Sequence, residues 1–426
     1  MSLLIKNGMV VCGDETVDAD VYAEGSKIVK IGANLDCAAD NVIDASGKIV
    51  MPGFVDMHCH LREPGQEYKE DIASGSAAAL RGGFTSVACM PNTVPPIDNA
   101  ALVKYVLTRA AEVDRAKVYP IGCITKHQQG KEIAEMGFMK ENGAVAFSDD
   151  GRPVENANIM RLALEYASGL KTLIISHSED KQLAADGVVN EGLNSTVSGL
   201  KGITRAAEEC MVSRDVILAE TLGARIHIAH VSTRGSVEII RQAKARGVAV
   251  TCETCPHYFS ATDDEILNYN TNSKINPPLR LQSDVEAIIE GLRDGTIDAI
   301  ATDHAPHHAD EKNLEFNLAP FGTSGFETAF SLAYTNLVET DIIDIAALSK
   351  LMSANPAKIL GIGSGEIKEG ERADIVVIDP EKSYTVDSSK FVSKGKNSLF
   401  NGWKLKGAVE YVIVDGMQKE IKNYDR

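Results

Sequence analysis

Positive charge is scarce in this chain. Its 426 residues include 43 Lys and Arg against 60 Asp and Glu, which gives a formal net charge of −17. Surfaces that bind nucleic acid or anionic membranes need clustered Lys and Arg to neutralise phosphate. The sequence therefore predicts no nucleic-acid and no membrane partner, although one local arginine is enough to hold a small anionic substrate.

Long apolar runs and regularly spaced cysteines are lacking as well. No stretch is long enough to span a bilayer. The first residues carry an early lysine and then acids, whereas a signal peptide has a basic start followed by an apolar run. The eight cysteines are scattered, unlike those of a small disulfide scaffold. These features predict a protein of the reducing cytoplasm.

What the chain does contain is a series of short apolar runs that alternate with helical patterns, which is typical of parallel strands covered by helices. Nearly all of these runs end in polar or ionisable residues, and the carboxyl edge of the strands is where a (β/α)8 barrel builds its active site. A doubly wound open sheet would alternate similarly, but more often has a Gly-rich turn after its first strand, and none occurs here. The eight runs are 53–60, 84–92, 117–125, 143–150, 173–180, 225–233, 248–257 and 298–308.

The predicted fold class is therefore α/β, with a (β/α)8 TIM-type barrel over residues 53–364. Short strands with turn signals occupy the first fifty residues. A similar pattern returns at 373–380 and 409–416. We expect residues 1–52 and 365–426 to build one small β-sandwich domain together.

The first barrel run ends in His58-Cys59-His60-Leu61-Arg62. Side chains alternate along a strand, so residues 58, 60 and 62 are expected to face the barrel axis, with Cys59 in the wall. Two imidazoles placed in this way can bind one metal ion. By itself a His-x-His pattern is a weak signal, and its position at a strand end strengthens it.

Further ligand candidates end four other runs. Singly, a terminal Asp is often a helix cap and a strand-end His often bonds a carbonyl. Together they supply four histidines and two carboxylates, enough for two divalent ions about 3.5 to 4 Å apart with one bridging carboxylate. Nitrogen and oxygen ligands suit Zn²⁺ and tolerate Mn²⁺ or Co²⁺, and such ions lower the pKa of a bound water towards about 7. The additional candidates are Asp149 or Asp150, His177, His230 and Asp303.

At this point the motifs resemble a known family, the class I dihydroorotases among the cyclic amidohydrolases of the amidohydrolase superfamily. The resemblance runs the length of the chain, and its motifs are specific in combination. They are HCHLREPG at 58–65, MPN at 90–92, FSDDG at 147–151, NPPLR at 276–280, ATDHAPH at 301–307 and SKGKNSLFNGWKLKG at 393–407.

The resemblance implies a catalyst for the reversible hydrolysis of (S)-dihydroorotate to N-carbamoyl-L-aspartate in de novo pyrimidine (UMP) biosynthesis. It implies His58, His60 and Asp303 at one metal, His177 and His230 at the second, and Asp150 as the bridge, as the last acid before a glycine. Asp303 is the implied catalytic residue, taking a proton and returning it to the leaving nitrogen. Because relatives often pair, a homodimer is the default expectation, and association with aspartate carbamoyltransferase is a further expectation.

The resemblance also implies a substrate-binding set. A guanidinium pairs bidentately with a carboxylate, so an arginine is physically suited to grip the α-carboxylate of dihydroorotate. Asn92 and His307 are expected to join it, while Asn276 and the backbone of Phe321 and Gly322 read the ring or its carbamoyl group. The whole predicted set is His60, Arg62, Asn92, Asn276, His307, Phe321 and Gly322.

Two other functions compete with this prediction. Hydantoinases, dihydropyrimidinases and allantoinases act on rings without a carboxylate, and Arg62 directly after the two histidines argues against them. A non-catalytic barrel that supports a transcarbamoylase should have lost ligands, and all six are present. Four further histidines and the Cys252-x-x-Cys255 pair are expected to be structural; these histidines are His127, His227, His257 and His308.

Overall fold

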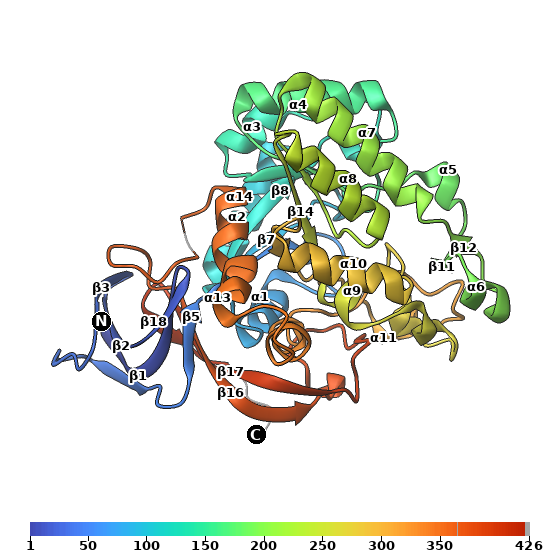
Figure 1. Cartoon of the computed structure of the whole chain (residues 1–426). Helices are drawn as coiled ribbons and strands as arrows, with labels where there is room; N and C mark the ends of the chain where they lie inside the picture. Colours follow the sequence, from blue (N-terminus) through green and yellow to red (C-terminus); the bar gives the residue numbers. More distant parts are fainter. Residues whose placement is uncertain (364, 422–426) are drawn as a thin grey trace.

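The computed structural model of the chain describes residues 1–363 and 365–421, and a parallel barrel lies at its centre (Figure 1). The barrel strands pair in chain order. Every predicted run contains one of them, which confirms the barrel. They are β6 (Phe54–Cys59), β7 (Phe84–Cys89), β8 (Lys117–Gly122), β9 (Ala146–Ser148), β10 (Ile174–Ser176), β13 (Ile226–Ile228), β14 (Val250–Thr254) and β15 (Ala299–Ile300).

The barrel closes between its first and last strands just beyond β15. Cys59 and His304 form a parallel bridge, and the amide of His60 donates to the His304 carbonyl at 2.9 Å. This contact brings His58 and His60, at the end of the first strand, beside Asp303, which follows the last strand. Closure therefore places segments about 240 residues apart in the chain at one mouth.

Helices surround the barrel, as Figure 1 shows for those that are labelled. The α-helices are α1 (Ile72–Arg81), α2 (Ala100–Val113), α3 (Met136–Glu141), α4 (Ala157–Leu170), α5 (Lys181–Ala184), α6 (Leu193–Ser198), α7 (Ala206–Leu222), α8 (Arg234–Ala245), α9 (Pro256–Ser260), α10 (Gln282–Arg293), α11 (Ala309–Lys312), α12 (Ala329–Ala333), α13 (Ile345–Ser349) and α14 (Asn355–Leu360). Short 3₁₀ or π segments are η1 (Lys126–Gln128), η2 (Asp263–Ile266), η3 (Thr271–Ser273), η4 (Tyr334–Val338), η5 (Lys350–Ala354) and η6 (Ser388–Lys390).

Local chemistry sets the ends of the helices. The Asp71 side chain accepts from the Ser74 amide, and the Asp71 amide donates to the Ser74 hydroxyl, so α1 begins with a capping box. Asn156 is the N-cap of α4, and its side chain accepts from the amides of Asn158 and Ile159. Gly223 ends α7 in the left-handed conformation that glycine adopts without cost.

The barrel strands are buried on both faces. Every residue of β6 and β7 is buried, as expected of parallel strands covered by helices. Phe54 packs against Phe84 and Phe330, with ring centroids 5.6 and 5.2 Å apart. This packing fixes the first strand, whose far end carries the ligand histidines.

Strands from both ends of the chain form one further sheet, at the lower left of Figure 1. Strand β16 pairs antiparallel with both β5 and β17 and so joins the two halves. This confirms that the termini build one β-structure. Its strands are β1 (Ser2–Cys12), β2 (Glu15–Glu24), β3 (Lys27–Gly32), β4 (Asn41–Asp44), β5 (Ile49–Pro52), β16 (Ile375–Thr385), β17 (Lys404–Val414) and β18 (Met417–Lys419).

A small two-stranded sheet, β11 (Val189–Asn190) with β12 (Gly202–Ile203), lies outside both sheets, near α5 and α6. The domain limits, 53–364 for the barrel and 1–52 with 365–426 for the β-domain, stay a prediction. Residue 364 and residues 422–426 lie outside the described residues. Among the helices of residues 1–363 and 365–421, none has the length and apolar character needed to cross a membrane.

Candidate metal and substrate site

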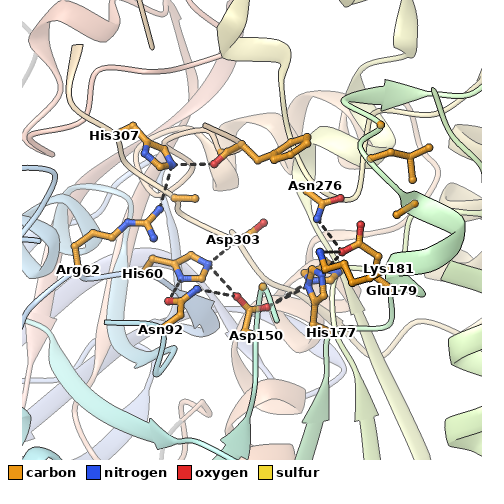
Figure 2. A pocket seen from close by; sticks show the side chains of 18 of the residues that line it. His60, Arg62, Asn92, Asp150, His177, Glu179, Lys181, Asn276, Asp303 and His307 are labelled. Carbon is orange, nitrogen blue, oxygen red and sulfur yellow. Dashed lines mark hydrogen bonds and ion pairs between the residues drawn. The ribbon is translucent and has the colours of Figure 1, made fainter. Parts of the chain in front are cut away.

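A cavity of about 270 Å³ lies at the carboxyl edge of the barrel strands. Eleven of the predicted site residues line it, and the twelfth, His58, is fully buried against Asp150. Figure 2 shows Arg62, His60 and Asn92 on one side of Asp150, and Asn276 with Glu179 and Lys181 on the other. The predicted residues in the wall are His60, Arg62, Asn92, Asp150, His177, His230, Asn276, Asp303, His307, Phe321 and Gly322.

Asp150 lies between two pairs of histidines. Its Oδ1 is 3.3 Å from His58 Nε2, and its Oδ2 is 3.6 Å from His60 Nε2. On the other side, Oδ1 is 3.4 Å from His177 Nδ1 and 3.6 Å from His230 Nε2. The carboxylate is thus placed to be shared by two ligand clusters, one on each side.

The alternative acid, Asp149, points elsewhere. Its carboxylate accepts from the amides of Ile124 and Thr125 at 2.8 and 3.1 Å and from the Thr125 hydroxyl. Asp149 therefore anchors the loop after β8, while Asp150, the next residue beyond the end of β9, faces the cavity.

The ligand atoms have the unmet bonding that a cation would satisfy. Among residues 1–363 and 365–421, buried His58 Nε2 and Asp150 Oδ1 have no hydrogen-bond partner. Burial alone would lower the pKa of His58, but the carboxylates of Asp150 and Glu253 raise it well above its ordinary value. Such a negative potential around buried imidazoles suits a divalent ion, which supplies positive charge in place of protons. The residues therefore fit a metal centre.

Asp303 lies beside the first pair of histidines. Its Oδ1 is 3.0 Å from His60 Nε2 and 3.6 Å from His58 Nε2. Burial by itself raises its pKa, but the hydrogen bond from His60 and the charges of nearby imidazoles bring it down to about 2. At neutral pH this carboxylate is ionised and can accept a proton.

Three of the site residues have left-handed backbone conformations. The φ angles are 61° at Arg62, 36° at His230 and 43° at Asp303. Non-glycine residues adopt such angles only where the surrounding structure enforces them, and they concentrate at functional sites. Strand β6 ends at Cys59, so the backbone turn, and not the strand alternation argued from the sequence, directs Arg62 into the cavity.

Two buried glutamates that the sequence reasoning missed hold the ligand histidines. Glu253 Oε1 is 2.7 Å from His58 Nδ1, and Glu179 Oε2 is 3.2 Å from His177 Nε2. A carboxylate on the second nitrogen orients an imidazole and leaves the first nitrogen free for metal. An acid within the apolar run of β14 was the available signal for Glu253.

Arg62 and His307 converge on the cavity. Figure 2 shows the side chains of Arg62 and His307 pointing toward each other. Arg62 Nη2 lies 3.3 Å from His307 Nε2, and Nε of Arg62 donates to the Pro306 carbonyl at 3.3 Å. Asn92 stands nearby with its amide engaged: its Oδ1 is 2.9 Å from His60 Nδ1 and its Nδ2 donates to Asp150 at 3.3 Å. Asn92 thus orients the ligands in addition to facing the cavity.

The predicted ring-reading residues lie farther along the wall. Asn276 Nδ2 donates to Glu179 at 3.3 Å. The Gly322 amide donates to the Lys274 carbonyl at 2.9 Å. Gly322 has φ 137°, and a Cβ there would lie 2.7 Å from the Ala305 carbonyl oxygen. Only glycine therefore lets the chain pass this close to the site.

Three of the histidines predicted to be structural have partners outside the ligand set, whereas His257 Nε2 is buried without a hydrogen-bond partner among the described residues. His227 contacts Thr251 Oγ1 at 2.8 Å and Glu253 Oε2 at 3.3 Å. His308 caps α11. Burial lowers the pKa of His257 to about 4. His127 lies 3.0 Å from Asp98. Cys252 and Cys255 are buried free thiols whose pKa burial raises, so neither supplies a thiolate at neutral pH.

Two lysines fasten the segment that carries Phe321 and Gly322. Lys312 Nζ donates to the carbonyls of Pro320 and Gly322, both at 3.0 Å. Lys274 Nζ lies 4.8 Å from the centre of the Phe321 ring. Burial lowers the pKa of Lys312 to about 7 and that of Lys274 to about 8. The segment is therefore held by side chains that are costly to protonate.

This burial predicts a pH-dependent stability. Lys312 binds a proton less readily in the folded chain than in the unfolded chain, so the folded state is penalised below about pH 7 and gains stability as the pH rises towards the ordinary lysine value of about 10.4. We expect the free energy of unfolding of the wild type, relative to that of Lys312→Met, to rise by about 1 kcal/mol per pH unit between pH 7 and 9. Urea titrations at both pH values measure it, with exposed Lys104→Met as the control. A difference that stays constant would contradict this prediction.

Comparisons with known proteins give a consistent result. The family model described as "Dihydro-orotase-like" matches residues 47–236. A dihydroorotase of Acetivibrio thermocellus is 55% identical over 97% of this chain and 98% of its own length. One of Citrifermentans bemidjiense is 55% identical over 98% and 99%.

Among solved structures, the L-hydantoinase (dihydropyrimidinase) from Arthrobacter aurescens superimposes with a TM-score of 0.87 at 27% identity, covering 98% of this chain and 95% of that one. The D-hydantoinase (dihydropyrimidinase) from a Thermus species gives a TM-score of 0.84 at 26% identity, over 98% and 94%. The fold and the arrangement around the barrel are thus those of known barrel hydrolases.

Proposed function

The chain belongs to the dihydroorotase family, and from this premise we propose how its cavity carries out the reversible hydrolysis of (S)-dihydroorotate to N-carbamoyl-L-aspartate. The observation that carries the substrate choice is the pair of donors, Arg62 and His307, that meet in the cavity beside the histidine cluster. A guanidinium fork recognises a carboxylate by geometry as well as by charge. Dihydroorotate has that carboxylate on its ring.

The cluster fits divalent metal, and we propose two ions, with Zn²⁺ preferred and Mn²⁺ or Co²⁺ tolerated by the same ligands. His58, His60 and Asp303 would hold one ion, His177 and His230 the second, and Asp150 would serve both. Bound there, the ions would supply Lewis acidity and a water acidic enough to lose its proton near neutral pH.

The protein's own side chains then hold the substrate in place and transfer the proton. Arg62, His307 and Asn92 hold the α-carboxylate, so the ring amide lies over the cluster. Asn276 and the backbone at Phe321 and Gly322 orient the ring from the other wall. Asp303, ionised and next to His60, takes the proton from the attacking water and returns it to the ring nitrogen as the C–N bond breaks. In the reverse direction the same carboxylate removes that proton before ring closure.

The nearest alternative is hydrolysis of an uncharged ring, because the solved relatives are hydantoinases. Turnover of dihydroorotate, hydantoin, dihydrouracil and allantoin should be compared on the purified metal-loaded protein. We expect dihydroorotate to be hydrolysed at least about 10²-fold more efficiently, since a site built around a charged group rejects analogues that leave it unpaired. Turnover of the three uncharged rings without that of dihydroorotate would refute the proposal.

Three further expectations supplement this proposal. They are a homodimer, association with aspartate carbamoyltransferase, and a cytoplasmic location. Family membership supports an enzyme acting on a small molecule. The other points stay predictions from the sequence.

A further inference from the structure

Lys69 is a buried cation beside the site that has no part in the functions described above. It lies in the turn between β6 and α1, and only 8% of its surface is exposed. Its Nζ is 3.4 Å from His307 Nδ1 and 3.0 Å from Glu311 Oε1. Lys69 does not line the cavity, so it reaches the substrate only through His307.

The neighbours of His307 determine which ring nitrogen carries hydrogen. Its Nε2 is 2.8 Å from the Phe321 carbonyl oxygen, which only accepts, so Nε2 donates. Its Nδ1 faces the Lys69 ammonium, which only donates, so Nδ1 accepts. Burial, and then the positive charges of Arg62, Lys69 and Lys312, hold the pKa of His307 well below its usual value, so the ring carries one proton.

This tautomer leaves two donors facing each other. With hydrogen on Nε2, His307 cannot accept from Arg62, although Arg62 Nη2 is 3.3 Å away. Both groups line the cavity, and a carboxylate oxygen between them would accept from Arg62 and from the Nε2–H of His307, which would then share or exchange its bond to the Phe321 carbonyl. In the other tautomer Nε2 would present a lone pair to the carboxylate and would itself take a hydrogen bond from Arg62.

Glu311 is placed to favour that unproductive tautomer. Its Oε2 lies 3.5 Å from His307 Nδ1, and a carboxylate there would accept a hydrogen from Nδ1. Lys69 occupies the lone pair of Nδ1 and binds Glu311 at the same time. The choice between the two tautomers therefore depends on the lysine.

We propose that Lys69 is a positioning residue that fixes His307 as an Nε2 donor and so sets the preference of the site for a ring that bears a carboxylate. The inference rests on the proposed carboxylate contact of Arg62 and His307. Its structural part, the tautomer of His307, does not depend on any activity and is measured separately.

The test compares Lys69→Met with Lys69→Arg, which keeps a cation that only donates. We expect Lys69→Met to raise KM for dihydroorotate about tenfold with kcat changed less than about threefold, as for a weakened hydrogen bond to a charged group. Lys69→Arg should remain within about threefold of the wild-type KM, because it still donates to Nδ1. Equal effects of the two variants would overturn the proposal.

A second pair of measurements tests the tautomer itself, and its wild-type part does not depend on the folding of Lys69→Met, because Nδ1–H in the wild type would overturn the inference. Nitrogen-15 NMR of histidine-labelled protein without substrate, with His307 assigned by its own substitution, should show Nε2–H in the wild type and Nδ1–H in Lys69→Met. The double variant Lys69→Met/Glu311→Gln should recover a lower KM, because the amide is able to donate to Nδ1. An unchanged His307 tautomer in Lys69→Met would overturn the inference while leaving the proposed function intact.

Discussion

Replacement of Asp303 by asparagine is expected to lower kcat for dihydroorotate hydrolysis by about 10³-fold, within the range attributed to general acid–base catalysis. The amide keeps the size of the side chain but cannot take up the proton that the ionised carboxylate accepts beside His60. Rates in both directions should fall together, because the same group acts in ring opening and in ring closure.

The matched control is Asp310→Asn, an exposed acid seven residues farther along the chain, in α11. Its kcat should stay within about twofold of the wild type, as is usual for surface changes away from a site. Metal content must be measured on both variants, so that loss of a ligand is separated from loss of the proton acceptor. An Asp303→Asn protein that retains its metal and more than a tenth of wild-type kcat would contradict the assigned role.

Replacement of Arg62 by methionine should lower kcat/KM for dihydroorotate by about 10²- to 10³-fold, mainly through KM, because hydrogen bonds to a charged group contribute about 1.5 to 3 kcal/mol each. Methionine keeps an apolar side chain of similar length and removes the guanidinium group. The slow hydrolysis of dihydrouracil, which has no carboxylate, should change little, so the preference for dihydroorotate should collapse.

Arg161→Met on the exposed face of α4 is the control for loss of an arginine at a distance from the cavity. It should leave both substrates unaffected. If Arg62→Met loses activity equally towards dihydroorotate and dihydrouracil, the arginine supports the site as a whole and does not select the carboxylate. An unchanged KM would remove the basis for the substrate assignment.

The barrel could be predicted from the sequence because its strands are buried on both faces and therefore appear as short apolar runs. The polar ends of those runs predicted the site, since parallel strands present their carboxyl ends at one edge. Some strands are shorter than their runs. β13 ends at Ile228 and β15 at Ile300, and His230 and Asp303 follow in left-handed conformations that strand periodicity does not describe.

The supporting residues were less predictable for a physical reason. Lys69 and His307 are 238 positions apart, and Lys274 and Lys312 meet their carbonyl partners only after the loops fold. A lysine in a polar turn has the same local pattern whether it is solvated or buried. The sequence therefore predicts the residues that end strands better than the residues that hold them from neighbouring loops.

The central claim is that six buried side chains bind divalent ions at one cavity. It is tested most directly by anomalous X-ray diffraction at the zinc edge on crystals of the zinc-loaded protein. We predict two anomalous peaks, one within ligand distance of His58 and His60 and one within ligand distance of His177 and His230, with Asp150 between them. Data without a peak at this cluster, or with metal bound only elsewhere, would contradict the account.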